Sequence, residues 1–116
     1  MRYARIYDGN DGETHFEDVE VALTQVDLAP PAPLFDVSMP RSCRVFSFVH
    51  LPVGWYGDQH PAPRHLLWVY LSGDVEIETS DGELRQFRCG DMVLAEDTSG
   101  KGHVSRVVGS ERSCSA

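Results

Sequence analysis

The chain has 116 residues, which is enough for one hydrophobic core and one domain. It carries 10 Lys and Arg against 18 Asp and Glu, a formal net charge of −8. This balance disfavours nucleic acid and anionic membrane surfaces as partners, because clustered Lys and Arg hold those partners. With 41% hydrophobic and 24% charged residues, we expect a single folded domain over residues 1–116.

The same composition carries an expectation about location. No apolar run approaches the roughly 18 residues that span a bilayer, and Met1 to Arg5 lack the apolar stretch of a signal peptide. We therefore expect a cytoplasmic protein. The three cysteines, Cys43, Cys89 and Cys114, form no Cys-x-x-Cys pair, which favours reduced thiols.

The first half of the chain contains two candidate strands. Residues 19–26 form the first, and a proline-rich loop at 29–33 follows, whose prolines donate no backbone hydrogen bonds. Residues 44–51 alternate apolar and polar side chains and are predicted as the next strand. No stretch of the sequence shows the three- and four-residue periodicity of a convincing helix.

The second half is denser in strand signals. Residues 65–71 are rich in aromatic and β-branched side chains and end at a Ser-Gly-Asp turn. In residues 75–79, Val, Ile and Thr alternate with two glutamates, as in a half-buried antiparallel strand. Further strands are predicted at 83–88, 92–95 and 104–108, before a polar tail at 109–116 that is expected to fray. Short strands at this spacing predict an all-β sandwich or barrel.

Two segments that contain histidine lie next to turns that lead into these strands. Residues 57–65 have the sequence Gly-Asp-Gln-His-Pro-Ala-Pro-Arg-His, and the strand after them ends at Gly73. Residues 90–103 begin Gly-Asp and end Gly-Lys-Gly-His. Their order and spacing resemble the two motifs of the cupin superfamily, whose members are small antiparallel jelly-roll β-barrels.

The resemblance covers about residues 40–108 and implies one cupin domain with N-terminal strands and the proline-rich loop before it. In its register, His60 and His103 fall on metal-binding histidines, whereas Ala62 and Leu66 occupy the two other ligand positions. Zn, Fe, Mn or Ni at His60 and His103 would thus have an incomplete ligand set, because such metals normally take three or four protein ligands. The resemblance further implies a homodimer, since cupins commonly dimerise through an outer sheet.

The same register also supports acid/base chemistry without a metal. It implies that Glu96 shares the cavity with His60 and His103, while its neighbour Asp97 faces the other way. An apolar cavity shifts the pKa of a carboxyl or imidazole group toward neutrality, which suits proton transfer. Substrate-binding side chains are expected at Trp68, Tyr70, Phe48 and Leu66, with Arg64 at the mouth as a partner for a substrate carboxylate.

Three classes of function remain open at this point. The first is an isomerase, lyase or cyclase that moves protons on a small organic molecule, with His60, His103 and Glu96 as catalytic residues. The second is a non-catalytic module that binds a small ligand or packs against a partner, which Leu66 in a polar position favours. The third is a metal-dependent dioxygenase, which the incomplete ligand set disfavours. The sequence contains no serine-hydrolase elbow, zincin helix or dinucleotide fingerprint.

Overall fold

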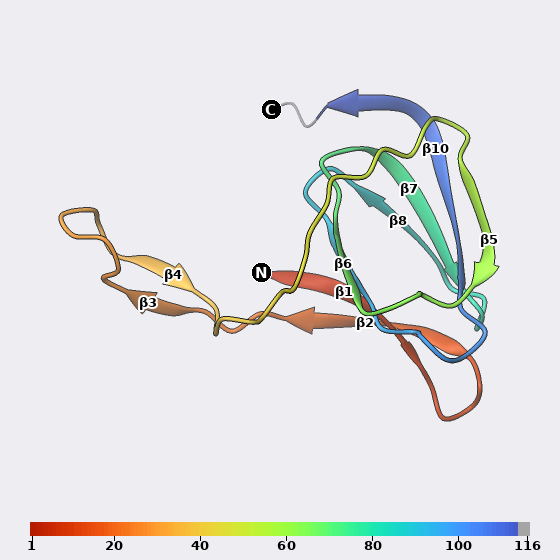
Figure 1. The fold of residues 1–116 in the computed structure, drawn as a ribbon, viewed down its shortest axis with the longest axis horizontal. Coiled ribbons are helices and arrows are strands. Elements are labelled where there is room, and N and C mark those ends of the chain that lie inside the picture. The colour runs from red at the N-terminus through yellow and green to blue at the C-terminus, as the bar shows by residue number, and fades with distance from the viewer. Residues whose placement is uncertain (114–116) are drawn as a thin grey trace.

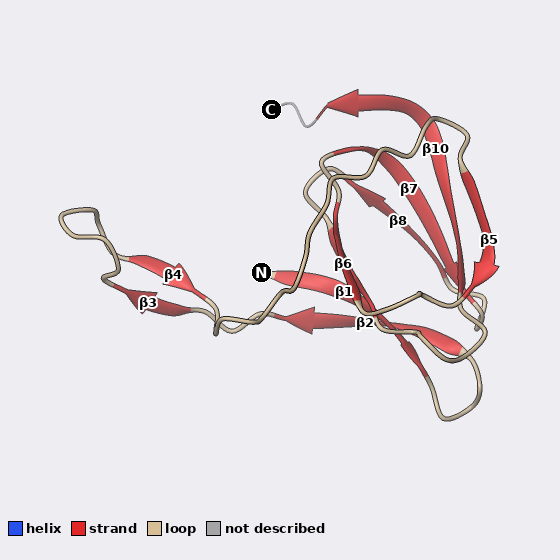
Figure 2. Cartoon of the chain, in the orientation of Figure 1, coloured by secondary structure: helices blue, strands red, loops and turns tan. Residues whose placement is uncertain are grey.

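The computed structural model describes the backbone of residues 1–113 and the side chains of residues 1–108 (Figure 1). All regular elements in this part of the chain are strands, so the all-β prediction is confirmed (Figure 2). Because it contains no helix, the described part of the chain has no helix able to cross a membrane. The ten strands are β1 (Arg2–Asp8), β2 (Thr14–Glu20), β3 (Thr24–Val26), β4 (Phe35–Val37), β5 (Tyr56–His60), β6 (Leu66–Val69), β7 (Ser72–Thr79), β8 (Leu84–Arg88), β9 (Met92–Ala95) and β10 (His103–Ser113).

Two four-stranded sheets form the body of the molecule. The first has the strand order β2-β1-β9-β6, with β1 and β9 parallel and the other neighbours antiparallel. The second is antiparallel and has the order β5-β10-β7-β8. Among the described strands, neither sheet closes on itself into a barrel.

The hydrophobic core lies between the two sheets. Alternate residues of a strand point to opposite faces of its sheet, so each strand contributes every second side chain to this core. Phe16 of the first sheet and Phe87 of the second meet there, with ring centroids 6.0 Å apart. The buried hydrophobic cluster consists of Ala4, Ile6, Phe16, Val75, Ile77, Phe87 and Val93.

The outward face of the second sheet carries a small cluster of charged side chains. Glu76 and Glu78 lie on the outward face of β7, and Arg106 of β10 reaches both, at 3.0 Å and 3.5 Å. Their alternation with Val75 and Ile77, which are buried, is the one that the sequence predicts. These carboxylates face solvent rather than a ligand.

The strands predicted between residues 65 and 108 are all present. The last one is longer than predicted, because β10 continues to Ser113, which pairs with Ser72 after a register shift. The expected fraying is therefore wrong for 109–113, and residues 114–116 lie outside the described part. Reduced thiols were expected throughout, yet Cys89 is disulfide-bonded, whereas Cys43 is free and exposed.

Two predictions for the first half of the chain are wrong. The strand predicted at 19–26 is split between the end of β2 and β3. β2 ends at Glu20, because Glu20 pairs with Arg2, the first residue of β1, and the chain then leaves the body. The alternating segment 44–51 belongs to none of the three described sheets. A period-two pattern becomes a strand only when a neighbouring strand satisfies its backbone, and the ladders between the described strands do not include this segment.

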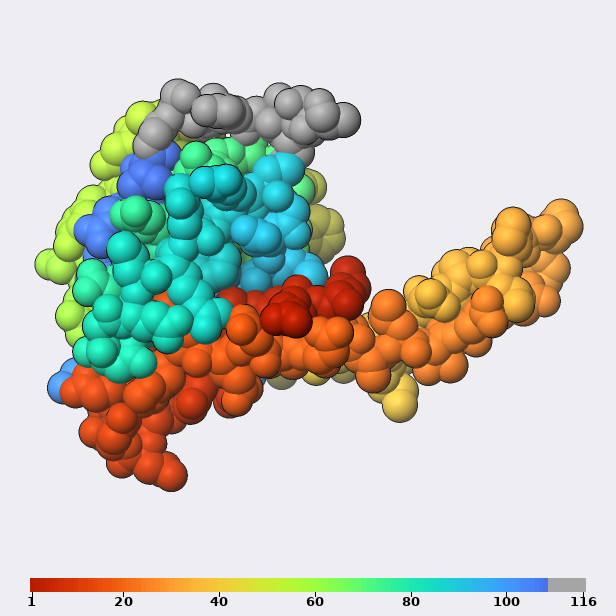
Figure 3. Space-filling model, turned by 180° about the vertical axis from the view of Figure 1, so that it is seen from behind, coloured from red at the N-terminus to blue at the C-terminus, as the bar shows by residue number. Residues whose placement is uncertain are grey.

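A hairpin arm, which we define as residues 21–43, projects from the body (Figures 1 and 3). It carries the two-stranded sheet of β3 and β4 and the proline-rich loop between them. The radius of gyration is 16.1 Å, against about 13 Å for a globular domain of this length, and the longest dimension is 50 Å. No residue of 21–50 is buried.

Candidate functional site

A cavity of about 250 Å³ lies between the two sheets, beside the hydrophobic core. Its walls come from β1, β6 and β9 of the first sheet and from β5, β7 and β10 of the second. Most of the wall is apolar, and the polar side chains gather where β5 ends and β10 begins. The lining residues are Ile6, Leu51, Trp55, His60, Ala62, Pro63, Leu66, Trp68, Tyr70, Val75, Ile77, Val93, Ala95, His103 and Ser105.

His60 and His103 meet at the polar end of this cavity. They are direct partners in the antiparallel pairing of β5 and β10, and their ring centroids are 6.1 Å apart. His103 and Ser105 are two positions apart on β10, so they face the same side of the sheet, and both line the cavity. The register with β5 shifts between them, because β5 has one residue more than β10 in this interval.

Gly102 sets the approach of the two histidines. Its φ is +79°, a left-handed conformation that residues with a Cβ rarely adopt. A Cβ at this position would overlap the carbonyl group of His60 and the nitrogen of Pro61. The glycine therefore allows the loop before His103 to pack directly against the backbone of His60.

The loop before His103 is also fixed from the first sheet. Thr14 is fully buried, and its hydroxyl donates a hydrogen bond of 2.8 Å to the carbonyl of Gly102. The amide of Ser80 donates to the same hydroxyl at 2.7 Å. Nearby, Asp8 accepts hydrogen bonds from the amide and hydroxyl of Ser99, each at 3.1 Å. His103 thus follows a loop held at both of its ends.

A buried carboxylate orients the ring of His103. Asp97 is 0% exposed, and its Oδ2 lies 2.6 Å from Nδ1 of His103. A carboxylate only accepts hydrogen bonds, so Nδ1 carries the proton and Nε2 keeps its lone pair. The amide of Ala62 donates to the Asp97 carbonyl at 3.0 Å, which ties this carboxylate to the segment after β5. The pair resembles the base and orienter of hydrolytic triads in its geometry.

His60 has the same tautomer for a different reason. Its Nδ1 lies 2.5 Å from the carbonyl oxygen of Asp58, which can only accept a hydrogen bond. Nε2 of His60 is therefore the unprotonated nitrogen of the neutral ring. His60 is exposed as a residue, so it stands at the mouth of the cavity, whereas only 11% of the His103 side chain is exposed.

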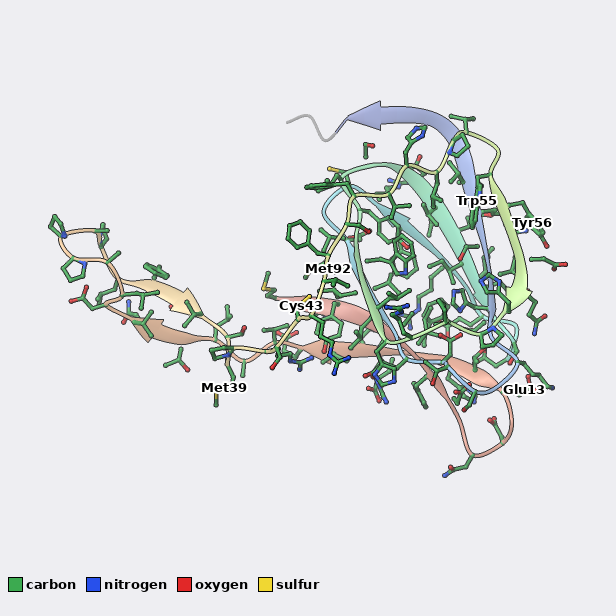
Figure 4. All side chains as sticks on the ribbon, in the orientation of Figure 1. Glu13, Met39, Cys43, Trp55, Tyr56 and Met92 are labelled. Atoms are coloured by element: carbon green, nitrogen blue, oxygen red, sulfur yellow. The ribbon has the colours of Figure 1, made fainter. Side chains whose placement is uncertain are left out.

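Aromatic side chains form the apolar wall. Tyr70 stacks on Phe87 with ring centroids 6.1 Å apart, and burial, with a smaller contribution from Asp91, raises the pKa of its hydroxyl far above the usual value. Tyr70 is thus a neutral hydrogen-bonding group throughout the physiological range. The indole ring of Trp55 lies against Gly57, where a Cβ would collide with it. The backbone carbonyl of Trp55 accepts a hydrogen bond of 2.9 Å from the amide of Val107. Figure 4 shows Trp55 beside β5 and β10.

The structure brings five of the predicted site residues to the cavity and leaves three outside it. His60, His103, Trp68, Tyr70 and Leu66 line the cavity. Arg64 is exposed and absent from the lining, because the turn before β6 points it to solvent. Phe48 is 84% exposed, because its segment does not join a sheet.

Glu96 is placed outside the cavity, contrary to prediction. Its neighbour Ala95 faces inward opposite Leu66, so the alternation of the strand directs Glu96 outward. There Glu96 lies 2.5 Å from Nε of Arg5 and 3.4 Å from Nδ1 of His65. Asp97 occupies the inward position that was expected of Glu96.

Sequence reasoning missed Asp97, Trp55, Leu51 and Ser105 as site residues. The signal for Asp97 is present in the chain, because Val93 and Ala95 are the small apolar residues of an inward face, and the next inward position is 97. The signal for Ser105 is also local, because it lies two residues after His103 on β10 and so faces the same side of the sheet. Trp55 and Leu51 reach it from a loop, whose path depends on the sheets around it.

The donor set at this site does not fit a transition metal. In the described part of the chain, no three His, Cys, Asp or Glu side chains are grouped so that they could hold a metal ion. His60 and His103 supply two imidazoles, and Ala62 and Leu66, which also line the cavity, have side chains that offer only carbon. Zn, Fe, Mn and Ni normally require three or four protein ligands.

Comparison with protein-family models, with curated proteins and with solved structures finds no match for this chain. The resemblance to cupins therefore depends on the residues of the two motifs alone.

Proposed function

We propose that this protein is a small cupin whose two facing sheets form a jelly roll, and that it transfers protons on a small organic molecule bound between them. The Asp97–His103 pair at the polar end of an apolar cavity carries this proposal. An imidazole with a fixed tautomer and a free Nε2 beside a cavity is the arrangement that general-base catalysis requires. Isomerisation, dehydration and cyclisation are the reaction classes that such a group serves.

In this proposal His103 is the base and Asp97 is its positioning residue. Nε2 of His103 takes a proton from the bound molecule, and Asp97 stabilises the imidazolium that forms, because its carboxylate lies 2.6 Å from Nδ1. The low exposure of both side chains strengthens this interaction, since little water screens it.

His60 is the second proton-transfer group. Its ring centroid lies 6.1 Å from that of His103, and it is exposed to solvent. His60 therefore takes up a proton from water at Nε2 and delivers it to the bound molecule, while the proton that His103 removed returns to water and restores both neutral rings. Ser105 and the neutral hydroxyl of Tyr70 provide hydrogen-bonding groups along the same cavity. A proton removed at one carbon and returned at another leaves the molecule with its atoms and charge unchanged.

The cavity wall also points to the class of substrate. No Lys or Arg is among the described lining residues, and Asp97 adds a negative charge behind the wall. A buried carboxylate without a facing cation disfavours an anionic substrate. A volume of about 250 Å³ equals about eight water molecules. We therefore propose a compact, uncharged and mostly apolar substrate with one polar group that faces the histidines.

A non-catalytic binding module is the second candidate. Ala62 and Leu66 line the cavity at positions where cupin enzymes place polar ligands, and this apolar replacement favours simple ligand binding. The two candidates share the cavity and differ in whether His103 exchanges a proton with the bound molecule.

Solvent-exchange measurements separate these candidates. A panel of small uncharged carbonyl compounds is screened for binding by ligand-observed NMR, and each binder is then incubated with the protein in D2O. We expect wild-type protein to incorporate deuterium at carbon. His103→Gln and Asp97→Asn should reduce the exchange rate by about 10²- to 10⁴-fold while binding persists.

Glu96→Gln is the matched control, because it neutralises the adjacent carboxylate, which points away from the cavity. It should leave the exchange rate unchanged. Binding without exchange in wild-type protein would establish the binding module instead. Elemental analysis of the same protein tests the conclusion that the cavity residues do not hold a transition metal. A stoichiometric metal that is lost in both His60→Ala and His103→Ala would refute proton transfer without a metal.

A further inference from the structure

Charge and exposed apolar side chains are distributed unevenly along the chain. Residues 37–73 contain one of the 18 acidic residues, Asp58, together with three arginines, so this stretch has a formal charge of +2 and the rest of the chain has −10. The least acidic stretch is also the one that exposes the most apolar side chains. It holds ten of the sixteen large hydrophobic residues that are exposed in the described part of the chain: Met39, Val45, Phe46, Phe48, Val49, Val53, Tyr56, Leu67, Val69 and Leu71.

Two phenylalanines lie at the centre of what we define as the apolar strip, residues 45–49 with the sequence Val-Phe-Ser-Phe-Val. Phe46 and Phe48 are 83% and 84% exposed, and their rings contact each other edge to face with centroids 6.0 Å apart. The strip runs along the outside of the body between the hairpin arm and β5, and it belongs to none of the three described sheets (Figure 1). Neighbouring phenylalanines this exposed on a folded protein indicate an interaction surface.

Two unpaired arginines precede the apolar strip. Arg41 and Arg44 are exposed, and neither forms an ion pair with another residue in the described part of the chain. Arg5 and Arg106 of the body, by contrast, are each held by two glutamates. A guanidinium without a carboxylate partner is free to bind the oxygens of a phosphate group, which match its planar set of N–H donors.

Exposed apolar side chains beside free arginines match the surface of a lipid bilayer. Apolar side chains of a peripheral segment enter the boundary between headgroups and acyl chains, while basic side chains next to them contact the phosphates. The apolar strip has no strand neighbour, so its backbone must stay hydrated at the level of the headgroups. A bilayer accepts such a strip without a matching groove or sheet edge.

The net charge of −8 opposes an anionic surface only where the acidic residues lie close to it. The Debye length is about 8 Å at physiological salt, whereas the molecule measures 50 × 36 × 24 Å. Carboxylates on the parts of the body distant from the strip are therefore screened. The same acidic surface would orient the protein, because residues 37–73 are the stretch that meets least repulsion.

We propose that the apolar strip docks this protein on a lipid bilayer that contains anionic lipid. Phe46 and Phe48 enter below the headgroups, and Arg41 and Arg44 bind their phosphates. The strip leads to Leu51 in the cavity wall, so the docked bilayer lies next to the cavity. An uncharged, mostly apolar molecule dissolved in the bilayer then has a short path to the site. This last step rests on the proposed function, whereas the docking does not.

Flotation with lipid vesicles tests the docking on the whole chain. Wild-type protein should float with vesicles of phosphatidylcholine and phosphatidylglycerol in a three-to-one ratio. Phe46→Ser combined with Phe48→Ser should lower the partition coefficient at least about tenfold, because the apolar area that enters the bilayer is lost. Arg41→Gln combined with Arg44→Gln should lower it about 10- to 30-fold on these vesicles and much less on phosphatidylcholine alone.

Leu28→Ser combined with Leu34→Ser is the matched control. These two leucines of the hairpin arm are 71% and 51% exposed, but they lie in a stretch that includes Asp27 and Asp36. The control should float like wild-type protein, and circular dichroism checks the fold of each variant. The measurement contains no substrate, so its outcome is independent of whether the cavity transfers protons.

Three results would overturn the proposal. The first is wild-type protein that stays out of the floating fraction with both kinds of vesicle. The second is flotation that the phenylalanine substitutions leave unchanged. The third is a molar mass of two chains that falls to one in the phenylalanine variant, without flotation of the wild type, which would assign the strip to a second copy.

Discussion

A single position along the chain separates the two carboxylates next to β9, and that position decides their chemistry. Glu96 points out to Arg5 and His65, where solvent and a cation surround it, whereas Asp97 is fully buried against His103. Because neighbours on a strand face opposite sides, an assignment that is wrong by one residue exchanges an ion pair on the outer face for a buried carboxylate that contacts His103. The substitution pair Asp97→Asn and Glu96→Gln is therefore a sensitive test of the proposed site.

His15 provides a prediction on pH dependence at the residue scale. Its ring nitrogens lie 2.9 Å from Asp11 and 2.9 Å from Asp81. The hydrogen bond with Asp11 raises the pKa of His15 and lowers that of Asp11. The stabilisation from a raised histidine pKa is fully present below the unfolded value of about 6.5 and is lost as the pH rises through the folded value. The stabilisation from the lowered pKa of Asp11 is lost as the pH falls through the pKa that Asp11 has in the folded protein.

His15→Gln should therefore reduce the free energy of unfolding most between about pH 4 and pH 6.5, and less at higher pH. Urea unfolding at a series of pH values measures this difference. His65→Gln serves as the control, because His65 is largely exposed and lies 3.4 Å from Glu96. A His15→Gln effect that stays equally large at alkaline pH would contradict the assignment.

At the scale of elements, the site depends on the loop that joins β9 to β10. Thr14 of β2 holds the carbonyl of Gly102, Asp8 of β1 holds Ser99, and the amide of Glu96 donates to the Ile6 carbonyl at 2.8 Å. The first sheet thus positions a loop that carries His103 into the second sheet. Strands and a hydrogen-bonded loop thus support the two histidines of the site.

Gly102→Ala tests this positioning, with Gly82→Ala as its matched control. Both glycines have a positive φ, +79° and +94°, so alanine costs about 1 kcal/mol at either position through the backbone alone. Only Gly102 has backbone atoms of His60 and Pro61 where a Cβ would lie, whereas open space surrounds Gly82. We expect Gly102→Ala to lose a further ~1–3 kcal/mol of unfolding free energy in denaturant titrations.

NMR spectra of the two alanine variants provide the second measurement. The imidazole signals of His60 and His103 should shift in Gly102→Ala and stay unchanged in Gly82→Ala. Equal stability losses, with both histidines undisturbed, would show that the close approach at Gly102 is not what places them.

On the scale of the whole molecule, the body and the hairpin arm differ in how they are held. The body has a core between two sheets, whereas no residue of 21–50 is buried in one copy. The free energy of local opening follows burial and hydrogen bonding, so the two parts should exchange their amide hydrogens at different rates.

Hydrogen exchange followed by mass spectrometry measures this difference. Amides of β7 and β9 should be protected, whereas amides of the hairpin arm and of residues 44–49 should exchange at the earliest times, because no residue of 21–50 is buried. Equal protection of the arm and the body would contradict this division.

The sequence by itself determined the local elements from residue 65 onward. Alternating side chains and glycine turns predict β6 to β10, because period-two burial and a positive φ are properties of the chain over a few residues. The resemblance, and not local pattern, brought His60 and His103 to one site together with Leu66, and all three line the cavity, as Trp68 and Tyr70 do.

Only the tertiary structure decided the rest, because it depends on what lies opposite. The pairing of β5 with β10 places His60 beside His103, and the register of β6 with β9 turns Ala95 inward, so that Asp97 and not Glu96 reaches His103. Residues 44–51 show the same limit, since their pattern specifies a strand but not the sheet that accepts it. The alternation of side chains along a strand determines which residues share a face of the sheet. What packs against that face is determined by segments that are distant in the sequence.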